Sequence, residues 1–242
     1  MKKTIIITGS SRGIGYETAR YFGKKGWQVV INACHNLARL EQAEQSLRSE
    51  GISVLSVPGD IGQPAFWKEL KEKTTRTFGS VDCIINNAAI SYVGLLTDMT
   101  VEQWETMMHI NLSSLFYCSK TFVPDMISKQ SGSIINITSV WGEVGASCEV
   151  AYSASKGGVI AFTKALAKEL APSHVAVNAL SLGMFDTEMN ACFSEEDKAA
   201  VIEEIPADRM GNAGEAAKVL YSLATTTNYL TGQVIRLDGA WI

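Results

Sequence analysis

The sequence has few of the residues that cross-linked or metal-bound folds require. Its five cysteines (Cys34, Cys83, Cys118, Cys148 and Cys192) and its three histidines are scattered along 242 residues, and no two cysteines form a CxxC pair. A disulfide framework needs paired cysteines and a zinc site needs clustered ligands, so both are disfavoured and no metal is expected. Scattered thiols suit a reducing compartment, and we expect a cytoplasmic location.

Proline, net charge and long apolar runs are also scarce. The five prolines mark no linker, and the sequence contains no repeat or low-complexity tract. A formal net charge of -4 gives no electrostatic basis for binding nucleic acid or an anionic membrane surface. No apolar run has the length of a membrane span or a signal-peptide core. We expect a single domain over residues 1–242 that contacts neither nucleic acid nor membrane.

Short β-rich runs alternate with helical stretches along the whole chain. The predicted strands are Thr4–Thr8, Gln28–Asn32, Val54–Val57, Asp82–Asn86, Ser133–Thr138, Val175–Leu180 and Gln233–Leu237. The predicted helices include Tyr16–Lys25, Leu37–Glu50, Pro64–Phe78, Val101–Ser128, Tyr152–Leu170 and Ala213–Ala224. This alternation predicts a three-layer, doubly wound α/β fold with a seven-stranded, mostly parallel sheet and ligands beyond the carboxyl ends of the strands. A (β/α)₈ barrel uses the same alternation, but an early glycine-rich turn and seven strands favour the open sheet.

Two local patterns indicate chemistry. Gly9, Gly13 and Gly15 lie between the first strand and the first helix, where glycine permits positive φ and lets a pyrophosphate rest on the helix N-terminus. Tyr152 and Lys156 are four residues apart, which places a phenol and an ammonium on one face of a helix. A nearby ammonium lowers the pKa of a phenol, so Tyr152 is expected to exchange protons near neutral pH during carbonyl/alcohol interconversion. Each pattern alone is weak.

Taken together with other motifs, these patterns resemble the short-chain dehydrogenase/reductase family over nearly the whole chain. The supporting motifs are Thr8-Gly9, Asn86-Asn87-Ala88-Ala89, Asn111, Ser139, the Tyr152/Lys156 pair and Thr231-Gly232-Gln233, in family order and at family spacing. The subgroup that the sequence most resembles is the beta-ketoacyl carrier-protein reductases. The resemblance implies a Rossmann fold and an NAD(P)(H)-dependent oxidoreductase that reduces a 3-oxoacyl-type or other small ketone to a secondary alcohol.

The resemblance also assigns roles to individual residues. Tyr152 is the expected proton donor, and Lys156 lowers its pKa and binds the nicotinamide ribose. Ser139 polarises the substrate carbonyl, and Asn111 holds a water in the proton relay. The alternative is a family member that binds dinucleotide as a scaffold or sensor with little turnover, but the intact set of four argues for the enzyme.

The end of the second strand favours NADP(H) over NAD(H). Family alignment puts Ala33 where NAD-specific members carry an aspartate, so no carboxylate is available to repel a 2′-phosphate. Arg12 resembles the basic residue that NADP-dependent members place against that phosphate, although it could instead be a solvated surface residue. Asn32 and His35 are secondary candidates for the same contact.

The remaining cofactor assignments also come from the resemblance. Asp60-Ile61 matches a pair that contacts adenine, with a helix N-cap as the alternative for Asp60. Asn87 is either a cofactor-side residue or a brace between strand ends. The full set of expected cofactor-binding residues is Gly9, Ser11, Arg12, Gly13, Ile14, Gly15, Asn32, Ala33, Asp60, Ile61, Asn87, Ala88, Tyr152, Lys156, Gly183, Phe185 and Thr187.

The sequence departs from the family after the sixth strand, where Leu182-Gly183 replaces Pro-Gly. Loss of proline frees φ at residue 182 and is expected to loosen the turn. Residues 184–208 are expected to form a substrate lid, or else an ordinary helix with a charged outer face. The apolar members of this segment are Met189, Phe193, Val201 and Ile202. The other candidate pocket residues are Trp141, Val144 and Cys148 as walls, with Glu143 and Glu149 as an acidic mouth or as solvent-facing residues.

Partners are a small-molecule substrate and further copies of the chain. The segment Val101–Ser128 is apolar on more than one face, which suggests more than one neighbour, and the resemblance implies a homodimer or homotetramer through it and the Tyr152 helix. A carrier protein is uncertain as a partner. The stretches that match the arginine-bearing docking surface, residues 128–131 and 172–174, contain Lys129 but no arginine. We therefore expect poor discrimination in favour of carrier-bound thioesters.

Overall fold

The computed structural model describes residues 2–188 and 194–242 and confirms the doubly wound α/β fold. Its sheet has seven strands in the order β3-β2-β1-β4-β5-β6-β7, and every pairing is parallel. The strands are β1 Thr4–Ile7, β2 Gln28–Ile31, β3 Val54–Ser56, β4 Cys83–Asn86, β5 Gly132–Ser139, β6 Val175–Leu182 and β7 Val234–Leu237. The strand order reverses between β1 and β4, which in doubly wound folds marks the ligand-binding crevice.

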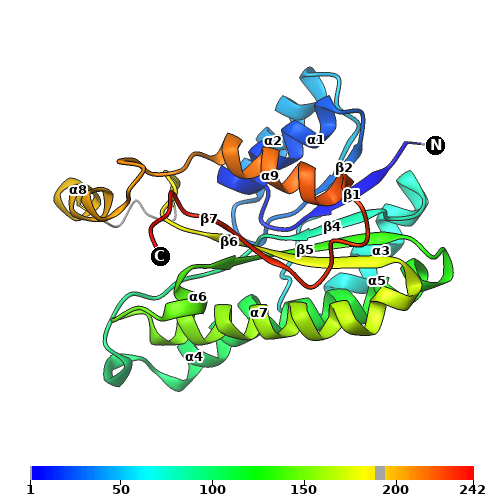
Figure 1. Cartoon of the computed structure of the whole chain (residues 1–242). Coiled ribbons are helices and arrows are strands. Elements are labelled where there is room, and N and C mark those ends of the chain that lie inside the picture. Colours follow the sequence, from blue (N-terminus) through cyan, green and yellow to red (C-terminus); the bar gives the residue numbers. More distant parts are fainter. Residues whose placement is uncertain (1, 189–193) are drawn as a thin grey trace.

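Helices cover both faces of the sheet, as Figure 1 shows: α1, α2 and α9 lie on one face and α3, α5 and α7 on the other. The helices are α1 Gly13–Lys24, α2 Leu37–Ser49, α3 Pro64–Phe78, α4 Val101–Met108, α5 Ser114–Ser128, α6 Trp141–Val144, α7 Val150–Leu170, α8 Glu195–Glu204 and α9 Ala213–Thr225. Short 3₁₀ turns occur at Leu96–Asp98 and Ala171–Ser173. Within the described ranges, no helix combines the length and apolarity needed to span a bilayer.

Strand β1 shows how the sheet divides the core into two layers. All four of its residues are fully buried, as expected for a strand covered on both faces. Ile5 and Ile7 join the cluster that contains Phe22 of α1, while Ile6 joins the cluster that contains Trp67 of α3. The period-two alternation of a strand thus sends successive isoleucines to opposite layers.

The predicted helix Val101–Ser128 is interrupted. The α-helical ladder ends at Met108, a π turn occupies His109–Ser113, and the α ladder resumes at Ser114. Asn111 lies in this turn and is buried. Such turns insert one residue into a helix and are frequent at functional sites.

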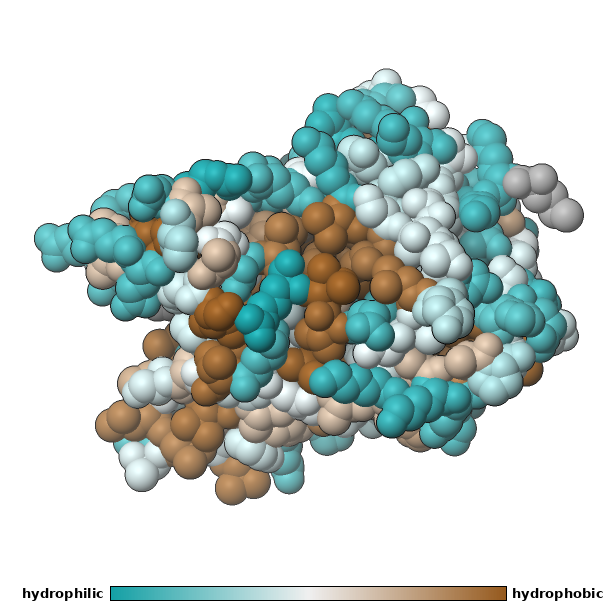
Figure 2. Space-filling model, in the orientation of Figure 1, coloured by the Kyte–Doolittle hydropathy of each residue, from teal (hydrophilic) through white to brown (hydrophobic). Residues whose placement is uncertain are grey.

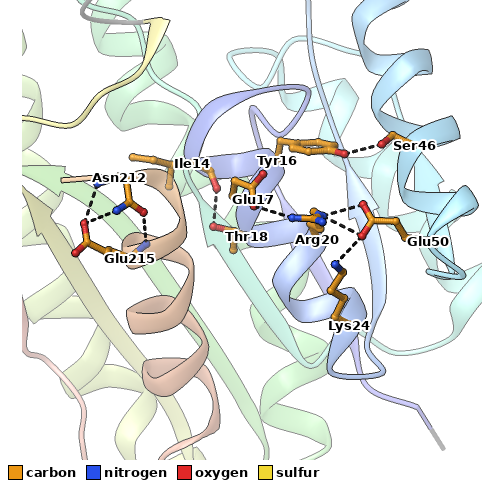
Figure 3. Close-up of polar contacts among 10 residues, drawn as sticks. All are labelled: Ile14, Tyr16, Glu17, Thr18, Arg20, Lys24, Ser46, Glu50, Asn212 and Glu215. Carbon is orange, nitrogen blue, oxygen red and sulfur yellow. Dashed lines mark hydrogen bonds and ion pairs between the residues drawn. The ribbon is translucent and has the colours of Figure 1, made fainter. Parts of the chain in front are cut away.

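Helix α1 is fixed to α2 by a cluster of polar contacts that Figure 3 displays. Arg20 and Lys24 both pair with Glu50, and the Tyr16 hydroxyl lies 2.8 Å from that of Ser46. The cluster is solvent-accessible, so its contribution to stability is small, and its main effect is to orient α1. In the same view, Asn212 caps α9 through a reciprocal pair of hydrogen bonds with Glu215.

A buried amide network joins the sheet to α7. Asn86 Nδ2 of β4 donates to Asn136 Oδ1 of β5 over 2.8 Å, and Asn136 Nδ2 donates to Thr163 Oγ1 of α7 over 2.9 Å. Asn136 and Thr163 are completely inaccessible to solvent. The network therefore fixes where α7 lies on the sheet.

We expect Asn136→Ala to lower the free energy of unfolding by about 2–4 kcal/mol, because it removes both bonds and leaves the Asn86 amide donor without this partner in a dry environment. Urea unfolding followed by circular dichroism measures the change. The control is Asn228→Ala, which removes one exposed bond to the His174 carbonyl and should cost less than about 1 kcal/mol. Equal effects of the two substitutions would contradict this account.

Candidate active site

A cleft of about 1230 Å³ opens at the carboxyl ends of the strands. It extends from the glycine-rich turn after β1, past the ends of β4 and β5, to the loop after β6. Small-molecule sites usually lie between 300 and 1,000 Å³, so this cleft is large enough for an extended ligand beside a smaller one.

The glycine-rich turn approaches β4 so closely that side chains are excluded. Gly9 has φ +63°, and a Cβ there would lie 2.8 Å from Ala88 Cα. A Cβ on Gly15 would lie 2.5 Å from the Gly9 carbonyl oxygen. Asn87 Nδ2 fastens the turn by donating to the carbonyls of Thr8 and Gly9, so this residue serves at least as the predicted brace. The cradle of bare backbone at the start of α1 fits a pyrophosphate.

Arg12 and Arg39 form a basic cluster at the end of the cleft near β2. Ala33 and His35 line the same end, and of these four residues Arg12, Ala33 and His35 were expected there. Arg39 was not identified from the sequence; it is the third residue of α2, and its backbone N–H donates to the capping side chain of Asn36. The available signal was its position just beyond the carboxyl end of a strand, where doubly wound folds bind ligands.

Three expected cofactor residues do not line the cleft. Asn32 is buried, and its amide donates to the carbonyls of Val57 and Gly59, so the prediction of a phosphate contact by Asn32 is wrong. These two hydrogen bonds hold β2 against the segment after β3. Asp60 and Ile61 also lie outside the lining, and Asp60 accepts from Gly62 N instead of capping α3, whose N-cap is Gln63.

Ser139, Tyr152 and Lys156 line the cleft together. Ser139 is the last residue of β5, and the other two lie one turn apart on α7. The Lys156 ammonium is buried, donates to the Ile137 carbonyl over 2.9 Å, and lies 5.6 Å from the centre of the Tyr152 ring. The structure thus brings together in the cleft three of the four residues that the sequence placed in one centre.

The pKa of Tyr152 differs from the sequence expectation. Burial and, to a smaller extent, the Glu149 carboxylate raise this pKa to about 12, against the opposing effect of a hydrogen bond with Ser139. Burial also lowers the pKa of Lys156 to about 8. The predicted lowering of the Tyr152 pKa is therefore wrong for this structure, because burial is the largest effect on the phenol.

Asn111 does not reach the cleft lining. Its side chain accepts from Ile90 N and donates to Ile90 O, both over 2.9 Å, and its amide also donates to Ser155 Oγ over 3.1 Å. These bonds tie the segment after β4 to α7. The side chain of Asn111 therefore acts as a brace in this structure.

The end of the cleft near α6 has an aromatic wall. Trp141 lines it as predicted, and its ring meets that of Trp241 edge to face at 4.8 Å. Trp241, which the sequence did not suggest, also donates from Nε1 to Glu204 of α8 over 3.3 Å. The predicted walls Val144 and Cys148 lie outside the lining.

The two predicted mouth carboxylates have different environments. Glu149 lines the cleft and accepts from Ser91 Oγ over 2.8 Å. Glu143 accepts from Ser181 and pairs with Arg236 instead, and it does not line the cleft. The expectation of an acidic mouth thus holds for Glu149 and is wrong for Glu143.

The segment after β6 crosses the cleft. Leu182 pairs with Ser139 of β5 and Leu237 of β7, so the sheet holds it as a strand residue and the expected loosening is not observed. Gly183, Phe185 and Thr187 line the cleft, as do Ser11, Ile14 and Ala88. Helix α8 follows and contributes Val201 to the lining, whereas Met189, Cys192 and Phe193 lie outside the described residues.

The stretches compared with a carrier-docking surface lie at the opposite edge of the subunit. Residues 128–131 and 172–174 precede β5 and β6, so they lie at the amino ends of strands whose carboxyl ends form the cleft. Lys129 donates to Val81 O and pairs with Asp82 over 2.9 Å. Lys129 therefore lies away from the mouth of the cleft.

Comparisons with known proteins agree with this architecture. A family model described as short chain dehydrogenase matches residues 3–198. A 3-oxoacyl-[acyl-carrier-protein] reductase of Staphylococcus epidermidis is 32% identical over 240 residues, covering 99% of this chain and 98% of the relative. The protein of that name from Synechocystis is 35% identical over 239 residues, covering 98% and 96%.

A solved structure supports the same assignment. The chain matches a protein proposed to be a gluconate dehydrogenase, from Agrobacterium tumefaciens, with a TM-score of 0.94 and 29% identity, covering 99% of this chain and 95% of the other. With a matching family model, full-length relatives and one shared architecture, the chain belongs to the short-chain dehydrogenase family and is an oxidoreductase of that family.

Proposed function

We propose that this protein reduces a ketone to a secondary alcohol with NADPH, using Tyr152 as the proton donor. The observation that carries the proposal is the meeting of Ser139, Tyr152 and Lys156 in the cleft that begins at the glycine-rich turn. Relatives named 3-oxoacyl-[acyl-carrier-protein] reductase support a 3-oxoacyl-type substrate, and the aromatic wall of Trp141 and Trp241 suits an apolar substituent.

Each of the three residues has a separate task. Ser139 Oγ donates a hydrogen bond to the carbonyl oxygen and so draws electron density from the carbon. Tyr152 gives its proton to the same oxygen as the alcohol forms, and the Lys156 ammonium stabilises the phenolate that remains. NADPH, when bound in the cleft, would supply the hydride. Asn111 supports the centre by holding Ile90 against α7.

The phosphate end of the cleft favours NADP(H). Arg12 and Arg39 line it, and no carboxylate occupies position 33 to repel a 2′-phosphate. Paired guanidinium groups present forked donors that match phosphate oxygens. The backbone cradle at Gly9, Gly13 and Gly15 would hold the pyrophosphate, and Phe185 and Thr187 would contact the nicotinamide end.

Helix α8 and the surface near α4 and α6 support two further parts of the proposal, a substrate lid and self-association. Helix α8 projects away from the sheet in Figure 1. Its Val201 lines the cleft, which suits a substrate lid. Figure 2 shows apolar residues gathered at the lower left, where α4 and α6 lie in Figure 1. Leu95, Val101 and Val144 are 59%, 68% and 60% exposed, which supports self-association as a dimer or tetramer. The cytoplasmic location remains a prediction.

Turnover of a ketone panel tests the proposal. Wild type should oxidise NADPH with 3-oxoacyl thioesters or other small ketones, without a large advantage for carrier-bound thioesters. Tyr152→Phe should lose about 10²–10⁴-fold in kcat because the proton donor is gone, while NADPH still binds. Fluorescence titration with NADPH is the control for folding. A variant that keeps more than about a tenth of wild-type turnover would falsify the role of Tyr152. If the wild-type protein binds NADPH but reduces no carbonyl in the panel, the result would instead indicate the scaffold alternative.

The rate of ketone reduction should depend on pH through Lys156. Burial lowers its pKa to about 8, whereas that of Tyr152 is raised to about 12, so Tyr152 stays protonated while Lys156 loses its proton as pH rises. We expect kcat/KM to be level below about pH 7 and to fall through pH 8. Steady-state rates between pH 6 and 10 measure this. Lys156→Met should lose the inflection along with most activity; an inflection that survives in this variant belongs to another group.

The preference for NADPH over NADH should depend on Arg12 and Arg39 and on the absence of a carboxylate at position 33. Wild type should have the higher kcat/KM with NADPH, and Ala33→Asp should reverse the order by setting a carboxylate against the 2′-phosphate. Arg12→Ala and Arg39→Ala should each lower kcat/KM for NADPH about tenfold with little effect on NADH, because both guanidinium groups are partly exposed and solvent screens them. A wild-type preference for NADH contradicts the assignment.

A further inference from the structure

Glu188 occupies the centre of the basic cluster. Its carboxylate accepts from Arg12 Nη1, accepts from Arg39 Nη1 over 2.8 Å, and completes a two-point pair with Arg39 through Nη2. These bonds cross the cleft, because Arg12 belongs to the turn after β1 and Arg39 to α2, whereas Glu188 follows β6. All three residues line the cleft.

The arrangement is the one that a phosphate monoester requires. A forked guanidinium with two parallel N–H donors and a second guanidinium beside it match the oxygens of either a carboxylate or a phosphate. Hydrogen bonds from Arg39 and then Arg12 hold the pKa of Glu188 below its ordinary value, so the side chain is an anion at neutral pH. An anion of the chain itself thus takes the donors that the 2′-phosphate needs.

The neighbouring residues make this more than an isolated surface pair. Thr187, one residue before Glu188, lies over the glycine-rich turn, where a Cβ on Gly13 would be 3.9 Å from Thr187 Cγ2. Ala33, Cys34 and His35 line the same end of the cleft and offer no carboxylate. Glu188 is the acidic group that faces both guanidinium groups, and it arrives from the far side of the cleft.

We propose that Glu188 is a specificity-determining residue that occupies the 2′-phosphate subsite and must be displaced when NADPH binds. This inference rests on the proposed preference for NADP(H). Competition by an internal anion lowers the affinity for the phosphate without touching the adenosine, so its removal should tighten only ligands that carry a 2′-phosphate.

Calorimetric titration with two nucleotide fragments isolates this effect from catalysis. 2′,5′-ADP and 5′-AMP differ only in the 2′-phosphate. In Glu188→Gln the Kd for 2′,5′-ADP should fall about two- to tenfold, the range expected for releasing partly screened ion pairs, while that for 5′-AMP changes by less than about twofold. Retained 5′-AMP binding also demonstrates that the variant is folded.

Two controls make the result specific. Glu169→Gln removes the same charge from an exposed position of α7 outside the cleft lining and should leave both affinities unchanged. In an Arg12→Ala, Arg39→Ala background, Glu188→Gln should no longer improve binding of 2′,5′-ADP, because the donors it releases are absent.

The outcomes separate this inference from the proposed function. If wild type binds 2′,5′-ADP no more tightly than 5′-AMP, the NADP(H) assignment fails and the inference fails with it. If wild type prefers 2′,5′-ADP but Glu188→Gln does not change its Kd, or shifts both ligands equally, the inference alone is overturned and Glu188 is an ordinary surface partner of the two arginines.

Discussion

The close approach of the glycine-rich turn to the end of β4 is the constraint on which the site depends. Gly9 lies against Ala88, Gly15 lies against the carbonyl of Gly9, and Asn87 fastens the contact with two hydrogen bonds. Because no side chain fits between these segments, bare backbone at the start of α1 can approach a ligand closely. The polar cluster between α1 and α2 keeps that helix aimed at the cleft.

Burial sets the charge state at the other end of the cleft. Lys156 is almost fully buried and its ammonium donates to the Ile137 carbonyl, while burial favours the neutral form of Tyr152. A neutral phenol can give a proton to an oxygen that is gaining electron density, which is the role proposed above for Tyr152. The amide network through Asn136 keeps α7, and with it both side chains, at a fixed place on the sheet.

The features predicted correctly from the sequence are those that depend on the spacing of residues along the chain. Seven strands, the glycine-rich turn and the Tyr152/Lys156 pair each depend on residues that are neighbours in the chain, and each was found in place. The errors arose where burial or a distant partner decides. Asn32 has a chemistry that suits phosphate, but the backbone of a neighbouring segment uses both its amide hydrogens.

Arg39 and Trp241 were missed for a related reason. Arg39 reaches the cleft because only a short loop separates the end of β2 from the start of α2, and Trp241 because the chain after β7 returns to α6. Neither position has a motif of its own. The pKa of Tyr152 was expected to be low from its distance to Lys156 along the helix, yet desolvation, which has no linear signature, is the larger effect.

The π turn at His109–Ser113 has a consequence for how the long segment before β5 is compared with that of other proteins. One additional residue in a helix rotates all later residues by about 100° about the helix axis. The side chains of α4 and α5 therefore follow different helical phases, although only the π turn separates the two helices. An apolar stripe traced through the whole segment changes face at the turn. The apolar faces of α4 and α5 therefore have to be compared with other proteins on separate helical wheels, and the phase changes in the π turn that contains Asn111.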